Sequence, residues 1–119
     1  MNKILSLLFL LSTSLLCHAH GGGNYEHSDM LASMKPGDKA ALLMMHFGTT
    51  HDDTRALTID AINAKAQAAF PELKFLEAYT SRIIIRRLKE RGITKLTPLD
   101  AMLKLRSEGY THLIVQSTN

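Results

Sequence analysis

Cysteine is nearly absent from this chain of 119 residues, which contains only one. That residue, Cys17, lies within an N-terminal stretch that has the features of a secretory signal peptide, covering residues 1–19. We expect cleavage after Ala19, which leaves a mature chain without any thiol. A disulfide framework, a thiolate metal site and a cysteine nucleophile are then all excluded.

The sequence also lacks an apolar run long enough to cross a membrane. Residues 4–16 are apolar, but they are fewer than the roughly 20 residues that a spanning helix needs. Lys3 before this run and small residues after it complete the signal-peptide pattern, so we expect an exported, periplasmic protein with no membrane span after cleavage. Lipidation at Cys17 is an alternative, but the bulky Leu16 in front of it disfavours this modification.

A strong charge of one sign is missing as well. The formal net charge is +3, and loss of Lys3 with the signal peptide leaves 13 of the 14 basic side chains against 11 acidic ones. This balance is too mild to indicate a nucleic-acid partner. Residues 20–38 are glycine-rich and polar without a sustained period, which is typical of a flexible spacer. The folded part is therefore expected to be residues 39–119.

The most informative stretch is residues 39–55, KAALLMMHFGTTHDDTR. Its continuous apolar run over residues 40–45 predicts a strand that is buried on both faces, as in a parallel sheet. Ligands of open parallel sheets bind just beyond the carboxyl ends of the strands. Residues 46–51 are therefore expected to lie where the chemistry takes place.

The rest of the chain alternates between helical and extended patterns. The expected order is a strand at 40–45, a helix at 50–69, a strand at 73–79, helices at 82–91 and 97–109, and a strand at 110–117. Thr80 and Ser81 are expected to cap the 82–91 helix, which Gly92 ends, and Thr97 is expected to cap the 97–109 helix. In the 82–91 helix the apolar residues Ile83, Ile84, Ile85 and Leu88 are expected to face inward. With right-handed crossovers, this order predicts an α/β domain in which helices flank a parallel sheet.

Three strands are few for a parallel sheet, which needs both of its faces covered. The sequence stops two residues after the third expected strand, where a ligand-contacting loop would follow. We expect either assembly with another copy or a separate second lobe, or a truncated form of a longer protein, and we favour truncation.

Four segments resemble the anaerobic-type sirohydrochlorin cobaltochelatases, a family of class II tetrapyrrole chelatases. They occur in the family's order and with similar spacing, and they cover about the first half of the family's length. The segments are ALLMMHFGTTHDDTRALTIDAI, AYTSRIIIRRLKERG, TPLDAMLKL and EGYTHLIVQS.

The resemblance implies one half of a flavodoxin-like, two-lobed fold with the tetrapyrrole bound between the lobes. The implied reaction inserts Co²⁺, as the substrate metal, into sirohydrochlorin in anaerobic cobalamin biosynthesis, and no organic cofactor is implied. The family's metal-binding histidines and acidic residue lie in the second half and have no counterpart here. The implied substrate-binding residues of this half are Phe47, Gly48, Thr49, Thr50, Tyr79, Thr80 and Ser81.

His46 departs from the family pattern, which usually has a small residue before the Phe-Gly-Thr stretch. In shorter relatives of the superfamily a histidine one place further along binds the metal. His46 is therefore either a metal ligand or a structural histidine at the cleft edge, since strand alternation would point it the other way.

The residues alone leave further alternatives open. Asp52 and Asp53 either take part in a metal site with the nearby histidines or serve as helix-start residues. Arg82, Arg86 and Arg87 either bind the carboxylates of an acidic macrocycle or form a solvated helix face.

Chelatase activity is the leading hypothesis for the function. The expected export is unusual for it, because this biosynthetic step is a cytoplasmic one, and two alternatives therefore stay open. The alternatives are a periplasmic protein that binds a tetrapyrrole such as haem, or a metal, without chelating, and a non-functional remnant.

Overall fold

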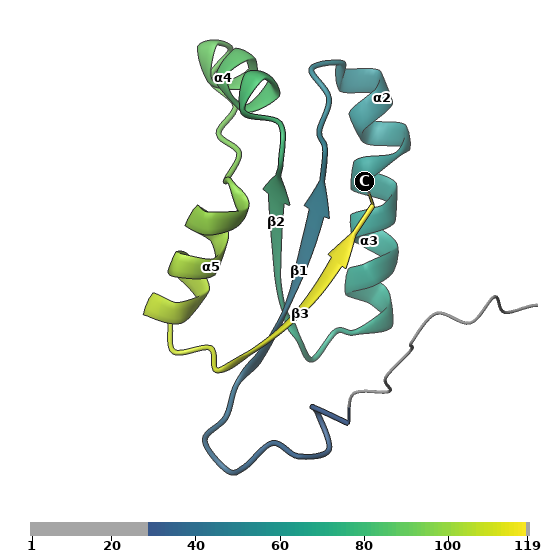
Figure 1. Ribbon diagram of the computed structural model, residues 1–119. Helices are drawn as coiled ribbons and strands as arrows, with labels where there is room; N and C mark the ends of the chain where they lie inside the picture. Colours follow the sequence, from purple (N-terminus) through teal and green to yellow (C-terminus); the bar gives the residue numbers. More distant parts are fainter. Residues whose placement is uncertain (1–28, 119) are drawn as a thin grey trace, which may run out of the picture.

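The computed structural model describes residues 29–118, and the expected signal peptide and residues 20–28 of the expected spacer lie outside them. Three parallel strands form one sheet in the order β2-β1-β3 (Figure 1). They are β1 (Ala40–His46), β2 (Lys74–Tyr79) and β3 (His112–Ser117). The predicted α/β class and the three co-directional strands are confirmed. The central strand β1 carries the continuous apolar run, and Ala41 to Met44 are at most 5% exposed because neighbours cover both faces.

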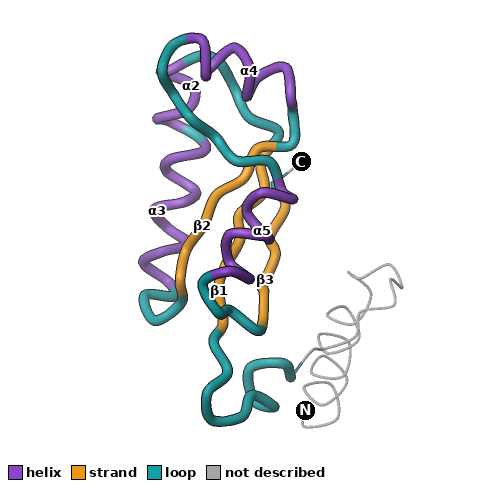
Figure 2. Tube along the Cα trace, turned by 90° about the vertical axis from the view of Figure 1, so that its left-hand side faces the viewer, coloured by secondary structure: helices purple, strands orange, loops and turns teal. Residues whose placement is uncertain are grey.

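Helices cover the two faces of this sheet (Figure 1). The helices are α2 (Asp52–Leu57), α3 (Ile59–Ala69), α4 (Arg82–Glu90) and α5 (Pro98–Ser107). On the α5 side, Ala101 packs with Leu43 and Ala78, and on the α3 side Tyr79 packs with Ile59 and Leu88. Helices α2 and α4 lie at the end of the sheet where the strands finish (Figure 2). Among residues 29–118, no helix has the length and apolar character needed to span a bilayer.

The single helix expected over residues 50–69 is interrupted at Thr58, which separates α2 from α3. The Thr58 hydroxyl donates a hydrogen bond to the Thr54 carbonyl at 2.6 Å, and the Thr58 ψ angle is −77°. A threonine hydroxyl that bonds back to the preceding turn bends a helix. The backbone bond from Ile62 N to Thr58 O at 2.9 Å continues the chain into α3. The prediction of one uniform helix was therefore wrong at this point.

The ends of α4 and α5 follow the predicted capping residues. Ser81 and Thr97 accept hydrogen bonds from the backbone N–H groups three residues further on, and Gly92 has the positive φ of +79° expected after α4. The expectation for Ile83 was wrong, because its side chain is 57% exposed. The inward stripe of α4 consists of Ile84, Ile85 and Leu88, and a nine-residue helix at the end of a sheet buries only that one stripe.

Candidate functional site

The ends of β1 and β2 are joined directly by backbone hydrogen bonds. Thr80 N donates to His46 O at 2.8 Å, and Ser81 N donates to Phe47 O at 3.2 Å. The two stretches predicted to bind the substrate, residues 47–50 and 79–81, therefore lie together at the carboxyl edge of the sheet. We call this edge the rim, and it is where ligands of parallel sheets bind.

Residues 47–50, which we call the rim loop, contact Tyr79 at Gly48. The φ angle of Gly48 is +102°, and a Cβ atom built there would lie 2.5 Å from Tyr79 Cδ2. Tyr79 is completely buried, and its hydroxyl has no hydrogen-bond partner among the described residues. Burial, together with the Glu77 charge, raises the pKa of Tyr79 to about 12, so the phenol stays protonated at neutral pH. Phe47 next to this contact is 60% exposed and faces solvent.

An ion pair between Asp52 and Arg91 connects the rim loop to the end of α4. Arg91 Nη2 lies 2.8 Å from both Asp52 oxygens, and Arg91 Nη1 donates to Thr50 O at 2.6 Å. Arg55 Nη2 adds a bond of 2.9 Å to Asp52 Oδ1. These bonds hold the pKa of Asp52 below its usual range, with the hydrogen bond from Arg91 as the largest cause. Asp52 and Asp53 both lie in the first turn of α2, as the helix-start interpretation expected.

We expect Asp52→Asn to lower stability at neutral pH but not in acid. The folded-state pKa of Asp52 is depressed, so the carboxylate contributes stability above its unfolded pKa of 3.8, and this contribution is lost as pH falls through the folded value. The urea unfolding midpoints of the variant and the parent should differ at pH 7, and this difference should shrink as the pH is lowered step by step below 3.8. Asp53 is next in sequence but forms no ion pair with a described residue, so Asp53→Asn should show no such pH-dependent difference. A difference between Asp52→Asn and the parent that stays constant over the whole pH series would contradict this role of Asp52.

His46 ends β1 and is 1% exposed, with both ring nitrogens bonded. Nδ1 lies 2.6 Å from Thr118 Oγ1, and Nε2 lies 2.7 Å from Asn63 Oδ1. Asn63 Nδ2 in turn donates to Glu77 Oε2, and Glu77 Oε1 pairs with Lys95 Nζ at 2.7 Å. We call this set of five residues the polar chain. It runs from Thr118 just after β3, through β1 and α3, to Glu77 of β2 and to Lys95 in the loop between α4 and α5.

The polar chain fixes the tautomer of the His46 ring. The Glu77 carboxylate only accepts hydrogen bonds, so the amide nitrogen of Asn63 faces it and the amide oxygen faces His46. The His46 Nε2 atom must therefore carry a proton. In the neutral ring Nδ1 is then the acceptor, and it receives the hydroxyl proton of Thr118 at 2.6 Å in preference to the Met45 carbonyl, which is 3.5 Å from the same hydroxyl oxygen. The basic lone pair of the ring consequently points toward the rim.

A shallow pocket of about 240 Å³ lies at this point of the rim. Its lining comes from the strand ends and from the start of α3. It consists of His46, Phe47, Gly48, Thr118, Thr58, Ile59 and Ile62. Within residues 29–118, no three histidine, cysteine, aspartate or glutamate side chains come together in a group that could hold a metal ion. The assignment of His46 as a metal ligand stays a prediction, and metal binding at Nδ1 would have to displace Thr118.

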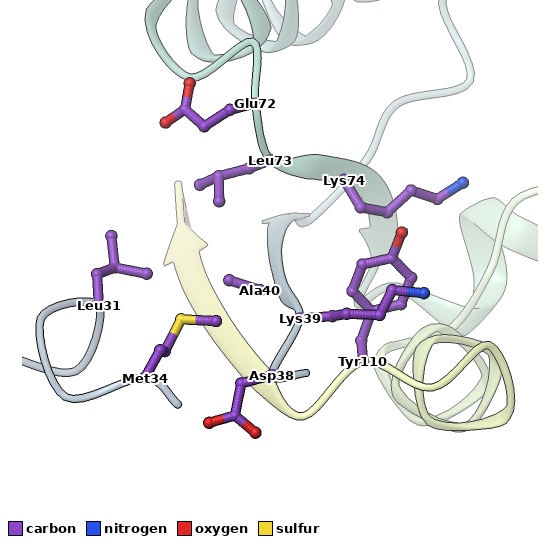
Figure 3. Close-up of a pocket in the computed structure, with 9 residues that line it drawn as sticks. All are labelled: Leu31, Met34, Asp38, Lys39, Ala40, Glu72, Leu73, Lys74 and Tyr110. Carbon is purple, nitrogen blue, oxygen red and sulfur yellow. The ribbon is translucent and has the colours of Figure 1, made fainter. Parts of the chain in front are cut away.

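A larger cavity of about 410 Å³ lies at the opposite end of the sheet, where the strands begin (Figure 3). Two of its charged groups, Asp38 and Lys39, already have partners. Lys39 Nζ lies 4.3 Å from the centre of the Tyr110 ring and donates to Glu108 O at 3.1 Å, and Asp38 accepts from the backbone N–H of Lys35. The cavity is also at the amino end of the strands, away from the edge where parallel sheets bind ligands. The rim is therefore the better candidate.

Sequence reasoning missed most of the polar chain and the arginines that hold Asp52. Two patterns could have revealed part of it. Glu77 is an acidic residue between the apolar Leu76 and Ala78 of a strand, and Asn63 lies four residues after the buried Ile59, on the same side of α3. Arg55 and Arg91 are far apart in sequence, and nothing local indicates that they share one carboxylate.

Comparison with known proteins agrees with this geometry. The family model described as "Cobalt chelatase (CbiK)" matches residues 40–119, which include the whole rim. A stretch of 80 residues is 41% identical to the sirohydrochlorin cobaltochelatase of Salmonella typhimurium and covers 66% of this chain. The same stretch covers 30% of that relative, so this chain spans less than a third of the relative's length. With a family match over well more than half of its residues, the chain belongs to the cobalt chelatase family.

Proposed function

We propose that this chain forms the rim-bearing lobe of a chelatase that inserts Co²⁺ into sirohydrochlorin. The observation that carries the proposal is that the family match extends over residues 40–119 and so includes both loops of the rim. The similar Salmonella protein is a sirohydrochlorin cobaltochelatase. Co²⁺ is the substrate metal in this reaction, its insertion releases two pyrrole protons, and no organic cofactor is needed.

The rim residues have distinct parts in this proposal. Phe47 offers an exposed flat apolar surface to the macrocycle, and Gly48 lets the loop settle on Tyr79. The hydroxyl groups of Thr49 and Thr50 are suited to hydrogen bonding with a carboxylate of the ligand. The second rim loop, containing Thr80 and Ser81, completes the surface.

His46 is the proposed metal-contacting group of this lobe. Histidines that bind metals commonly donate their other ring N–H to a carboxylate or carbonyl group, which fixes the ring. The Nε2–H of His46 has such a partner in Asn63, which is itself held by Glu77. The Nδ1 lone pair is then the one available to an incoming ion, once Thr118 turns away.

The test follows Co²⁺ insertion through the absorption change of sirohydrochlorin. We propose export to the periplasm, so the chain is purified from that compartment and its N-terminus, expected at His20, is checked by mass spectrometry. It should metallate sirohydrochlorin faster than the spontaneous reaction, and His46→Ala should slow insertion about tenfold or more. His112→Ala is the matched control, because this histidine lies at the amino end of β3.

The other outcomes are also decisive. Binding of sirohydrochlorin without metallation would overturn the chelatase proposal and favour a periplasmic tetrapyrrole carrier. A chain that neither binds nor metallates sirohydrochlorin would overturn both the chelatase proposal and the carrier alternative. Metallation at the parent rate by His46→Ala would remove His46 from the metal site and leave the chelatase proposal intact.

A further inference from the structure

Helix α4 carries four cationic side chains that take no part in holding the fold. Arg82, Arg86, Arg87 and Lys89 are exposed, and none of them forms an ion pair with any residue in the described part of the chain. Cations elsewhere near the rim are used differently. Arg91 binds Asp52, and Lys95 binds Glu77. These four unpaired charges share one helix at the end of the sheet where the strands finish (Figure 1), whereas the unpaired Lys35, Lys65 and Arg106 lie outside α4.

Arg82 also occupies an electrostatically unfavourable position. It is the first residue of α4, and the first turn of this helix contains no acidic residue. The first turns of the other three helices contain Asp52 and Asp53, Asp60, and Asp100. Because the amino end of a helix dipole is positive, an arginine there opposes the dipole and makes α4 less stable. A bound anion would remove this repulsion.

Two exposed apolar side chains border these charges. Ile83 is 57% exposed and Phe47 is 60% exposed. The hydrogen bond between Ser81 N and Phe47 O, 3.2 Å long, brings Phe47 next to the start of α4. An aromatic and an aliphatic surface beside unpaired guanidinium groups suits a flat apolar ligand that carries carboxylates at its periphery.

We propose that Arg82, Arg86 and Arg87 bind the peripheral carboxylates of the macrocycle while Phe47 and Ile83 contact its apolar face. Arg82 and Arg86 are four residues apart, so they lie on one side of α4 and can bind neighbouring carboxylates. This inference rests on the proposed function and deepens it, because it makes the number of carboxylates the property by which this lobe selects its ligand.

The test measures equilibrium binding without metal, using the full chain and two water-soluble porphyrins as probes. Uroporphyrin carries eight carboxylates and coproporphyrin carries four. The parent should bind uroporphyrin more tightly in low salt. A triple variant with Arg82→Gln, Arg86→Gln and Arg87→Gln should bind uroporphyrin at least about tenfold more weakly and lose most of its preference for uroporphyrin. The difference between parent and variant should shrink in about 1 M salt.

A charge-matched control carries Lys35→Gln, Lys65→Gln and Arg106→Gln. These side chains are exposed, lie outside α4 and form no ion pair with a described residue, so the control loses the same charge elsewhere and should bind uroporphyrin nearly as the parent does. Equal weakening in the two triple variants would overturn the site, since net charge alone would then explain binding. Equal affinity of the parent for both porphyrins would overturn it too.

The two proposals can fail separately. Porphyrin binding that depends on the three arginines, in a chain that never inserts Co²⁺, would overturn the chelatase proposal and support this site. The chain could also insert Co²⁺ into sirohydrochlorin while its affinity for porphyrins is unchanged by the three arginine substitutions. That result would overturn this site and support the chelatase proposal.

Discussion

Replacing Gly48 by alanine is expected to lower the free energy of unfolding by about 3 kcal/mol. Part of this loss is conformational, because alanine is strained at the Gly48 φ angle of +102°. The larger part is steric, because the new Cβ atom would lie 2.5 Å from Tyr79 Cδ2. Tyr79 is fully buried and packs against Ile59 and Leu88, so its ring has no space into which to move. Urea unfolding monitored by circular dichroism measures the loss.

Gly37→Ala separates the two contributions. Gly37 has a similar φ angle of +93°, but nothing lies within 4 Å of the position of its Cβ atom. Its substitution should therefore cost only the conformational part, about 1 kcal/mol. Equal losses in the two variants would show that the contact between the rim loop and Tyr79 does not constrain Gly48.

Replacing Asn63 by leucine is expected to lower the free energy of unfolding by about 2–4 kcal/mol. Asn63 is 7% exposed and its amide connects His46 to Glu77. Leucine has the same branching and the same number of side-chain heavy atoms, so the shape is approximately retained while the buried Nε2–H of His46 loses its acceptor and Glu77 loses a donor. A buried polar group without a partner costs more than the hydrogen bond itself contributed.

A double-mutant cycle tests this explanation. In the Asn63→Leu background, His46→Leu removes the N–H group that has lost its acceptor. The loss of unfolding free energy caused by His46→Leu should therefore be at least about 1 kcal/mol smaller in that background than in the parent. Gln67→Leu, on the exposed side of α3, is the control and should stay within about 0.5 kcal/mol of the parent. Additive losses for His46 and Asn63 would mean that the two residues do not act through a shared hydrogen bond.

Local patterns in the sequence were enough to predict most of the fold. The apolar run before His46 predicted the buried central strand, and Thr97, Gly92 and Ser81 predicted helix ends, because each of these features depends on a few neighbouring residues. The interruption at Thr58 was missed because the surrounding helical pattern continues through it. One side-chain hydroxyl bends the helix without changing that pattern.

The site was predictable only in outline. The parallel strands placed residues 47–50 and 79–81 at one edge, as expected from the chain direction alone. The polar chain was not predictable, because its five members come from five separate parts of the sequence and meet only through packing. The position of Ile83 was missed for a related reason: how much of a helix is buried depends on where it sits against the sheet.

Asp52 and Arg91 are 39 positions apart in the chain, yet their contact ties the rim loop to the helix that bears the proposed carboxylate-binding arginines. The two segments that are proposed to face the ligand are therefore linked to each other before any ligand arrives. A macrocycle that binds across both would lose little entropy in ordering the protein, and more of its contact energy would appear as affinity.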